Sequence, residues 1–360
     1  MFPETEELIR LFERLNPEQF ILRPEEILEL LDLPRNLWLQ DLRRPVTSLV
    51  EQLDCHKEKF PALLVFSPAE LLFSCGIALT PADSTNQKKT QYLTYSYGHF
   101  FQGNTSELLL SRDILKWLVG ERQKMAEHLS VGVAWFFMAR HLRMLHICDF
   151  NSAVNQNFVN KVGKKKRPDY CGLRNRRLDF LEVKGGINKR QDLPKKIEEG
   201  KLQFEAVKSL KLNAGGNFVI ATDFEVEGGS NSNTLTQIWD PDNINDEIEN
   251  IDDLDDFIRL SYAKVFRYAG SDFLANYLIQ NKQLPHDFYR FTQQVQGPFK
   301  PIGFNPFGGF IYLHERVLQI LWRREVRDID KQIRNYKFEK TDDNFIVLPN
   351  GAAIYGKRKS

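Results

Sequence analysis

The chain has 360 residues, of which 42% are hydrophobic, and its formal net charge is +1 at pH 7. This hydrophobic content allows a sizeable buried core, so the composition excludes a globally disordered protein. The balanced net charge by itself neither favours nor excludes an acidic partner such as nucleic acid.

Cysteine usage and hydropathy point to the cytoplasm. The four cysteines are widely spaced, without the spacing of a zinc site or a disulfide framework, which favours a reducing compartment. The acidic start "MFPETEELIR" is not a signal peptide. The longest apolar run, at 131–139, is too short to cross a bilayer, so we expect no membrane partner.

Residues 1–110 are predicted to form an N-terminal α/β region. The segments "ETEELIRLFERL" and "RPEEILELLDL" have the apolar spacing of helices. The segments "PALLVFS" and "QYLTYSYGHFF" have the composition of strands, with a polar loop between them.

Residues 111–225 are predicted to form the core. The pattern over 112–146 is helical, and we expect a break near Gly120 because glycine weakens a helix interior. The segments after it are predicted to be a strand ("HICDF"), a polar loop, two strands in "RPDYCGLRNRRLDFLEVKGG", a helix from Asp192, and a buried strand at 217–224. This order predicts an α/β fold with a mixed sheet flanked by helices.

The remaining chain is predicted to be less regular at first. Residues 226–256 are rich in Gly, Ser and Asn and then acidic, which indicates a loop or linker. We favour an acidic surface loop there over an internal mimic of nucleic acid. Residues 257–360 are predicted to be mainly helical, with a break in "QGPFKPIGFNPFGG" and a hairpin that turns at Asn350-Gly351.

The stretch "RPDYCGLRNRRLDFLEVKGG" carries charges in an apolar context. Side chains alternate along a strand, so Glu182 and Lys184 should share one side, with Asp169 opposite on the neighbouring strand. Two close carboxylates repel each other unless a cation lies between them, and Mg²⁺ prefers oxygen ligands. Gly185 and Gly186 are expected to leave room for a ligand. The alternative is an edge hairpin whose Glu182–Lys184 pair is solvated.

"RPD" followed by "EVK" resembles the signature of the PD-(D/E)xK nuclease superfamily, which has the restriction-endonuclease-like fold. The resemblance implies that Asp169, Glu182 and the Val183 carbonyl bind Mg²⁺, for which Mn²⁺ substitutes. It also implies that Lys184 serves the attacking water. Glu199 and Lys201 form a second E-x-K, but in a polar helical context.

The resemblance extends to neighbouring helices. Many members add a glutamate from the helix before the first core strand, and Glu127 is the best match, with Glu121 weaker. Some members place a glutamine or tyrosine on the helix after the motif, a place that Gln203 matches weakly. The resemblance covers roughly residues 121–224.

The charge distribution indicates a polyanionic substrate. Residues 161–211 contain sixteen Lys and Arg but seven Asp and Glu, so this segment is +9. Four consecutive basic residues form its most positively charged run, which we expect either to contact phosphates or to be a solvated loop: Lys164, Lys165, Lys166 and Arg167.

These features predict a Mg²⁺-dependent endonuclease that cuts DNA. The family resemblance implies a role in prokaryotic restriction or anti-phage defence, and paired sites that cut a duplex suggest a homodimer or a partner subunit of a defence complex. Two alternatives stay open: a non-catalytic nucleic-acid-binding or assembly subunit that retains the fold, and a nuclease directed at RNA.

Overall fold

The computed structural model describes residues 42–53, 60–82, 97–98, 100–101, 105–156, 158, 167–174, 177–204, 214–240, 254–305, 309–326, 329, 333 and 345–355. The helices predicted before residue 42, most of "QYLTYSYGHFF" and the acidic segment at 241–253 lie outside these ranges. Within them, none of the helices is both long and apolar enough to cross a membrane.

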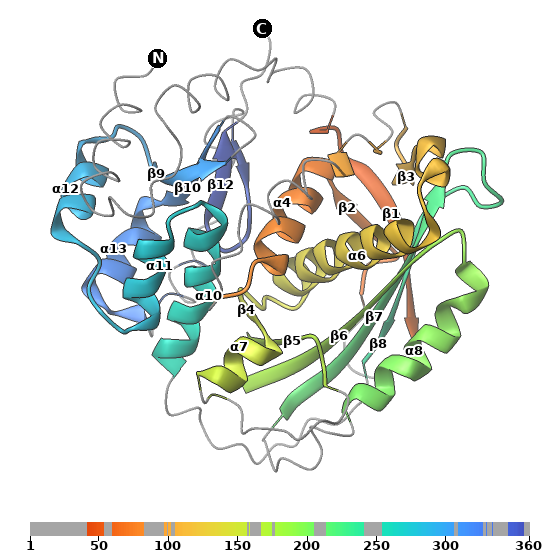
Figure 1. The fold of residues 1–360 in the computed structure, drawn as a ribbon, viewed down its shortest axis with the longest axis horizontal. Coiled ribbons are helices and arrows are strands. Elements are labelled where there is room, and N and C mark those ends of the chain that lie inside the picture. Colours follow the sequence, from red (N-terminus) through yellow and green to blue (C-terminus); the bar gives the residue numbers. More distant parts are fainter. Residues whose placement is uncertain are drawn as a thin grey trace, which may run out of the picture.

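A mixed sheet of eight strands forms the centre of the molecule (Figure 1). Its order is β2-β1-β8-β7-β6-β5-β4, with β3 paired to β7 beside this path. The strands are β1 (Val46–Leu53), β2 (Leu63–Phe66), β3 (Leu109–Leu110), β4 (His146–Asp149), β5 (Tyr170–Arg174), β6 (Arg177–Ile187), β7 (Ala214–Val226) and β8 (Leu235–Trp239). The pair β6·β7 is parallel and β5·β6 is antiparallel, which confirms the predicted mixed sheet.

Helices cover both faces of this sheet (Figure 1). They are α4 (Pro68–Leu79), α6 (Val119–His141), α7 (Phe150–Asn155) and α8 (Leu193–Lys201), with the short 3-10 turns η1 (Arg112–Lys116), η2 (Arg190–Asp192) and η3 (Leu202–Phe204). Gly185 of β6 faces Ala126 of α6, and Glu182 faces Gly200 of α8. Positions 182 and 185 point to opposite faces of a strand, so α6 and α8 lie on opposite sides of β6.

The predicted break near Gly120 is confirmed, because the interruption falls at residues 117–118, between η1 and α6. From Val119 onward, α6 runs without a break through Gly120 and Gly132. Gly132 lies where α6 crosses α4, and a Cβ there would be 2.8 Å from the Leu71 carbonyl oxygen. The glycine therefore serves close helix packing, and this packing compensates its low helix propensity.

Gly185 should tolerate no side chain. A Cβ at this position would overlap the backbone carbonyl of Ala126, which a side-chain rotation cannot relieve. We expect Gly185→Ala to lower the free energy of unfolding by about 3 kcal/mol in urea titrations. Gly120→Ala is the matched control, because its Cβ would meet open space; it should be neutral or stabilise by up to about 1 kcal/mol. Equal stabilities for the two variants would contradict this packing.

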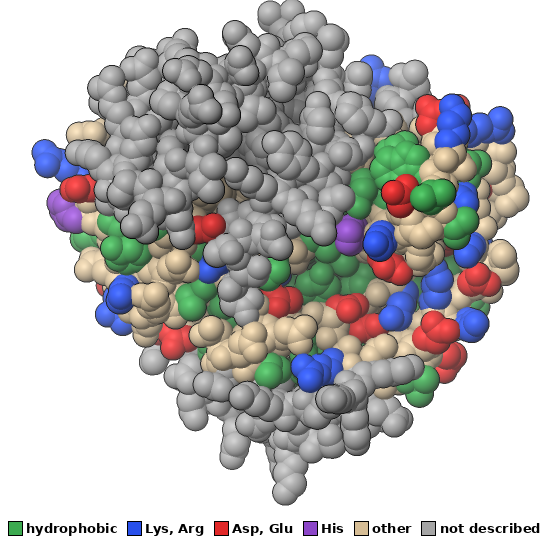
Figure 2. Space-filling model, in the orientation of Figure 1, with side chains coloured by type: hydrophobic (Ala, Val, Ile, Leu, Met, Phe, Trp, Pro, Cys, Tyr) green, Lys and Arg blue, Asp and Glu red, His purple; other side chains and the backbone are tan. Residues whose placement is uncertain are grey.

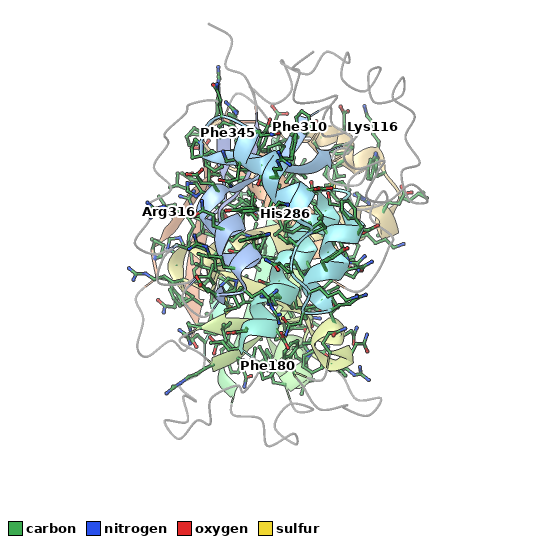
Figure 3. All side chains as sticks on the ribbon, turned by 90° about the vertical axis from the view of Figure 1, so that its left-hand side faces the viewer. Lys116, Phe180, His286, Phe310, Arg316 and Phe345 are labelled. Atoms are coloured by element: carbon green, nitrogen blue, oxygen red, sulfur yellow. The ribbon has the colours of Figure 1, made fainter. Side chains whose placement is uncertain are left out.

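In the described residues, the C-terminal part combines four helices with a second, four-stranded sheet of order β11-β12-β10-β9. Its elements are α10 (Leu254–Tyr268), α11 (Asp272–Ile279), α12 (His286–Gln294), β9 (Phe299–Asn305), β10 (Gly309–His314), α13 (Glu315–Arg323), β11 (Phe345–Val347) and β12 (Ala352–Tyr355). Figure 3 views the molecule from this side, with Phe345 of the small sheet and Phe180 of the large sheet at opposite ends. The predicted hairpin is confirmed, with Gly351 at φ +84° in its turn.

Two predictions about organisation are corrected. Residues 299–305 and 309–314 are paired strands where we expected only a break between helices, since Pro301 lies on an edge strand that tolerates it. Residues 235–239, predicted as part of a linker, form β8 between β1 and β7. The large sheet therefore extends across the predicted boundaries at residues 110 and 225.

Candidate active site

The candidate site lies where β6 loses its pairing with β5. The register of these strands begins at Tyr170 opposite Leu181, and the chain before Tyr170 turns away. Pro168 has no N–H to donate to a ladder. Asp169 instead accepts a hydrogen bond from the Val183 backbone N–H through Oδ2, at 3.0 Å. Asp169 therefore lies one residue before β5 and not on the strand as predicted, and its carboxylate occupies the next position along the open edge of β6.

Glu182 and Lys184 form a close ion pair on the same side of β6. Lys184 Nζ lies 2.5 Å from Glu182 Oε1, which confirms that the two side chains share a side. Glu182 is only 1% exposed, and its Oε2 has no hydrogen-bond partner among the described residues. The alternative of a solvated pair on an edge hairpin is wrong because Glu182 is buried, although the pair does lie on the part of β6 that β5 leaves open.

Burial and charge shift the pKa values at this site. Burial raises the pKa of Glu182 to about 8, and the nearby Asp169 carboxylate adds to this rise while Lys184 opposes it. Burial alone would lower the pKa of Lys184, but the ion pair with Glu182 outweighs it and the net pKa is raised. Burial also raises the pKa of Asp169, and the hydrogen bond from the Val183 N–H opposes this rise. Solvent reaches the exposed side of Asp169 and makes the rise smaller.

Two helices reach the same open edge from opposite faces of the sheet. Gln123 of α6 donates through Nε2 to the Gly185 carbonyl and to Glu127 Oε1, both at 3.0 Å. Lys196 of α8 also donates to the Gly185 carbonyl. Glu127 contributes to the raised pKa of Asp169, so its exposed carboxylate acts on the site through its charge.

The double glycine accommodates protein groups rather than a ligand. α6 backbone fills the space beside Gly185. A Cβ at Gly186 would lie 2.5 Å from Lys196 Nζ and 3.0 Å from Asp223 Oδ1. Asp223 is buried on β7 and accepts from the Lys189 backbone N–H at 2.8 Å. The prediction that these glycines leave room for a ligand is therefore wrong, because Lys196 occupies the space beside Gly186.

Gln123, Lys196 and Asp223 were not expected from the sequence. Gln123 precedes Glu127 by four residues, a spacing that places both side chains on one face of a helix. The sequence therefore contained a pattern from which a role for Gln123 beside Glu127 could have been predicted. Lys196 and Asp223 meet only after α8 packs against β6 and β7, and neither residue belongs to a recognisable motif.

The other predicted site residues lie on neighbouring segments or outside the described ranges. Glu121 is exposed in the first turn of α6, and Gln203 is half-buried in η3. Arg167 donates through Nη1 to Asn151 Oδ1 at 3.2 Å, close in sequence to Asp169. Lys164, Lys165 and Lys166 fall outside the described residues.

Only a sparse metal site is compatible with these side chains. In the described part of the chain, no cluster of three or more His, Cys, Asp or Glu side chains is arranged to hold a metal ion. Asp169 and Glu182 supply two carboxylates. A third protein ligand would have to be a backbone carbonyl, with water or substrate oxygens completing the coordination, which is typical of Mg²⁺.

Acidic and basic side chains are interspersed on the surface over the region of α6, β6 and α8 (Figure 2). No family model, curated protein or solved structure matches the chain. The functional conclusion therefore depends on the geometry around the open edge of β6.

Proposed function

We propose that this protein is a Mg²⁺-dependent endodeoxyribonuclease with a restriction-endonuclease-like core. One observation carries the proposal: Glu182 is a buried carboxylate with an unpartnered oxygen, beside Asp169 and paired with Lys184. Such a carboxylate is costly to the fold, and strongly perturbed groups of this kind cluster at functional sites. The mixed sheet, with α6 before β4 and α8 after β6, supports the proposed core.

The residues present fit a magnesium ion. Glu182 Oε2, the exposed side of Asp169 and the carbonyl of Val183 would hold it, because Val183 lies at the open edge where its N–H already meets Asp169. When bound, Mg²⁺ supplies Lewis acidity toward a phosphate oxygen and charge stabilisation for the leaving oxyanion.

The chain's own groups would prepare the substrate for attack. Lys184 stays cationic because Glu182 holds its ammonium, and 26% of its side chain is exposed, so it can reach a phosphate oxygen or orient the attacking water. Gln123 keeps the Glu127 carboxylate beside the open edge. Glu127 would there accept a hydrogen bond from water near the scissile phosphate.

The basic segment favours a nucleic acid as the substrate. Residues 161–211, the segment of sequence that contains Asp169, Glu182 and Lys184, have a net charge of +9, which would attract a phosphate backbone. We take DNA as the substrate, with cleavage of duplexes by a homodimer or with a partner subunit in a restriction or anti-phage system. An RNA substrate is the competing outcome of the same assays.

Metal-dependent stabilisation tests the site directly. Mg²⁺ at about 100 times its Kd should raise the free energy of unfolding of the wild-type protein by about 2.7 kcal/mol. Asp169→Ala should abolish this gain because it removes a metal ligand. Thermal denaturation with Mg²⁺, Mn²⁺ or EDTA measures both effects, and plasmid cleavage in the same buffers measures activity.

Asp113→Ala is the matched control, because Asp113 is an exposed carboxylate that pairs only with Lys116 on η1 in the described structure. It should keep both the stabilisation and the cleavage. A wild-type protein that binds DNA without any metal effect would instead favour the non-catalytic binding subunit. Cleavage of RNA alone would reassign the substrate.

A further inference from the structure

A buried lysine from the C-terminal part reaches the strands that carry the candidate site. Lys264 of α10 is 1% exposed, and its Nζ donates to the carbonyl of Ala78, in the last turn of α4, at 2.9 Å. The same Nζ lies 3.8 Å from Asp149 Oδ2 and 5.4 Å from the centre of the Tyr170 ring. A buried ammonium is costly without such partners, so this arrangement needs an explanation.

The partners of Lys264 are the immediate neighbours of Asp169. Asp149 is directly opposite Tyr170 in the β4·β5 pairing, and Tyr170 follows Asp169 in the chain. The backbone N–H of Phe150, which follows Asp149, donates to the Asp169 carbonyl at 2.9 Å. Asp149 also caps α7, since its Oδ1 accepts from the Ser152 N–H at 2.7 Å.

Asp149 therefore connects α10 to the open edge. Its Oδ1 fixes the start of α7, and its buried Oδ2 has no hydrogen-bond partner among the described residues, so the charge of Lys264 is what compensates it. The junction of β4 and α7 then holds the Asp169 backbone, and the Asp169 side chain holds the Val183 N–H. α10 lies beside β4 and α4, in a place to maintain this series of contacts (Figure 1).

We propose that Lys264 is a positioning residue for Asp169, so that helix α10 is an integral support of the open edge of β6. The positioning itself can be measured without a metal. Its consequence for catalysis rests on the proposed nuclease function.

Hydrogen exchange of two amides tests the positioning. The Val183 and Phe150 N–H groups both donate to Asp169, one to its side chain and one to its backbone. In Lys264→Met, NMR should show the Val183 and Phe150 amides exchanging about 10-fold faster relative to the Ile220 amide of β7. The reason is that Asp169, the residue that accepts both hydrogen bonds, moves. Lys264→Arg retains the charge and should restore slow exchange.

Arg267→Met is the matched control. Arg267 is a second buried cation of α10, 3% exposed, and it donates to the Ala82 carbonyl, Asp272 and Asn276, none of which lies on β4. It should destabilise the protein without a selective change at Val183 and Phe150. Should Lys264→Met fail to fold, Asp149→Asn gives the same test, because asparagine keeps the helix cap while removing the charge that Lys264 faces.

The outcomes separate the two proposals. Two results together support both proposals. Exchange at both amides should be selectively faster in Lys264→Met, and the Mn²⁺ Kd measured by calorimetry should rise about 10-fold for Lys264→Met but not for Arg267→Met. Unchanged relative exchange overturns the positioning role, whatever the activity. If exchange is selectively faster in Lys264→Met but the wild-type protein neither binds Mn²⁺ nor cleaves DNA, the positioning role is upheld and the nuclease proposal is overturned.

Discussion

Replacing Glu182 by glutamine should stabilise the metal-free protein at alkaline pH while abolishing its metal-dependent activity. The ordinary pKa of this carboxyl, 4.5, is raised to about 8 in the folded protein, chiefly by burial. Such a rise corresponds to at most about 5 kcal/mol, and we expect Glu182→Gln to recover about 3 kcal/mol of it at pH 8.5. The glutamine keeps the shape of the side chain and needs no charge in the buried position.

The sign of the pH dependence follows from the two pKa values. Below pH 4.5 the carboxyl is protonated in both the folded and the unfolded chain, so it contributes no difference. Between pH 4.5 and about 8 the unfolded chain ionises first, and the wild-type protein loses stability relative to the variant. Urea titrations from pH 5 to 8.5 should therefore show the two proteins diverging as the pH rises.

The second E-x-K of the chain supplies the control for this prediction. Glu199 lies on α8 and is exposed, with Lys195 Nζ at 3.9 Å. Glu199→Gln should leave the stabilisation by Mg²⁺ and plasmid cleavage unchanged. Its charge contributes to the raised pKa of Lys184 less than Glu182 does, so it should change the pH dependence far less than Glu182→Gln. If Glu182→Gln followed the wild-type stability curve at every pH, the carboxyl would be ordinarily solvated and the argument for a metal site would fail.

Local patterns were enough to predict much of the candidate site. Alternation along "LDFLEVKGG" placed Glu182 and Lys184 on one side, and the strand–turn–strand pattern brought Asp169 next to Val183. The buried β7 and the helix beginning near Asp192 also follow from apolar runs and end signals. These features depend on residues a few positions apart, which a single sequence records directly.

The features that were missed depend on contacts between distant segments. Gly185 and Gly186 look like space for a ligand until α6 and α8 are packed against the two faces of β6. β8 is a five-residue strand that owes its place to pairing with β1 and β7, since its flanks are typical of loops. Lys264 lies in an amphipathic helix whose sequence gives no sign that a lysine would be buried.

Lys184 offers the clearest separation between catalysis and folding. Lys184→Ala should reduce metal-dependent plasmid cleavage about 100- to 1000-fold, because it removes the only cation that the described structure places in contact with Glu182 and the group that would face the phosphate. Lys201 of the second E-x-K is the matched control. It pairs with Glu198 at 2.6 Å and lies over the Trp239 ring, so Lys201→Ala should cleave like the wild type.

A second readout of Lys184→Ala distinguishes a lost catalytic group from a damaged metal site. Lys184 lowers the pKa of Glu182, so removing it should raise that pKa further above its present value of about 8. A carboxylate must be deprotonated to hold a metal, and the pH midpoint of Mn²⁺ binding should therefore move upward by at least about 1 unit. If cleavage recovers fully at high pH along with Mn²⁺ binding, the role of Lys184 is limited to lowering the pKa of Glu182. Cleavage that stays low after Mn²⁺ binding has recovered would assign Lys184 a direct part in the attack on the phosphate.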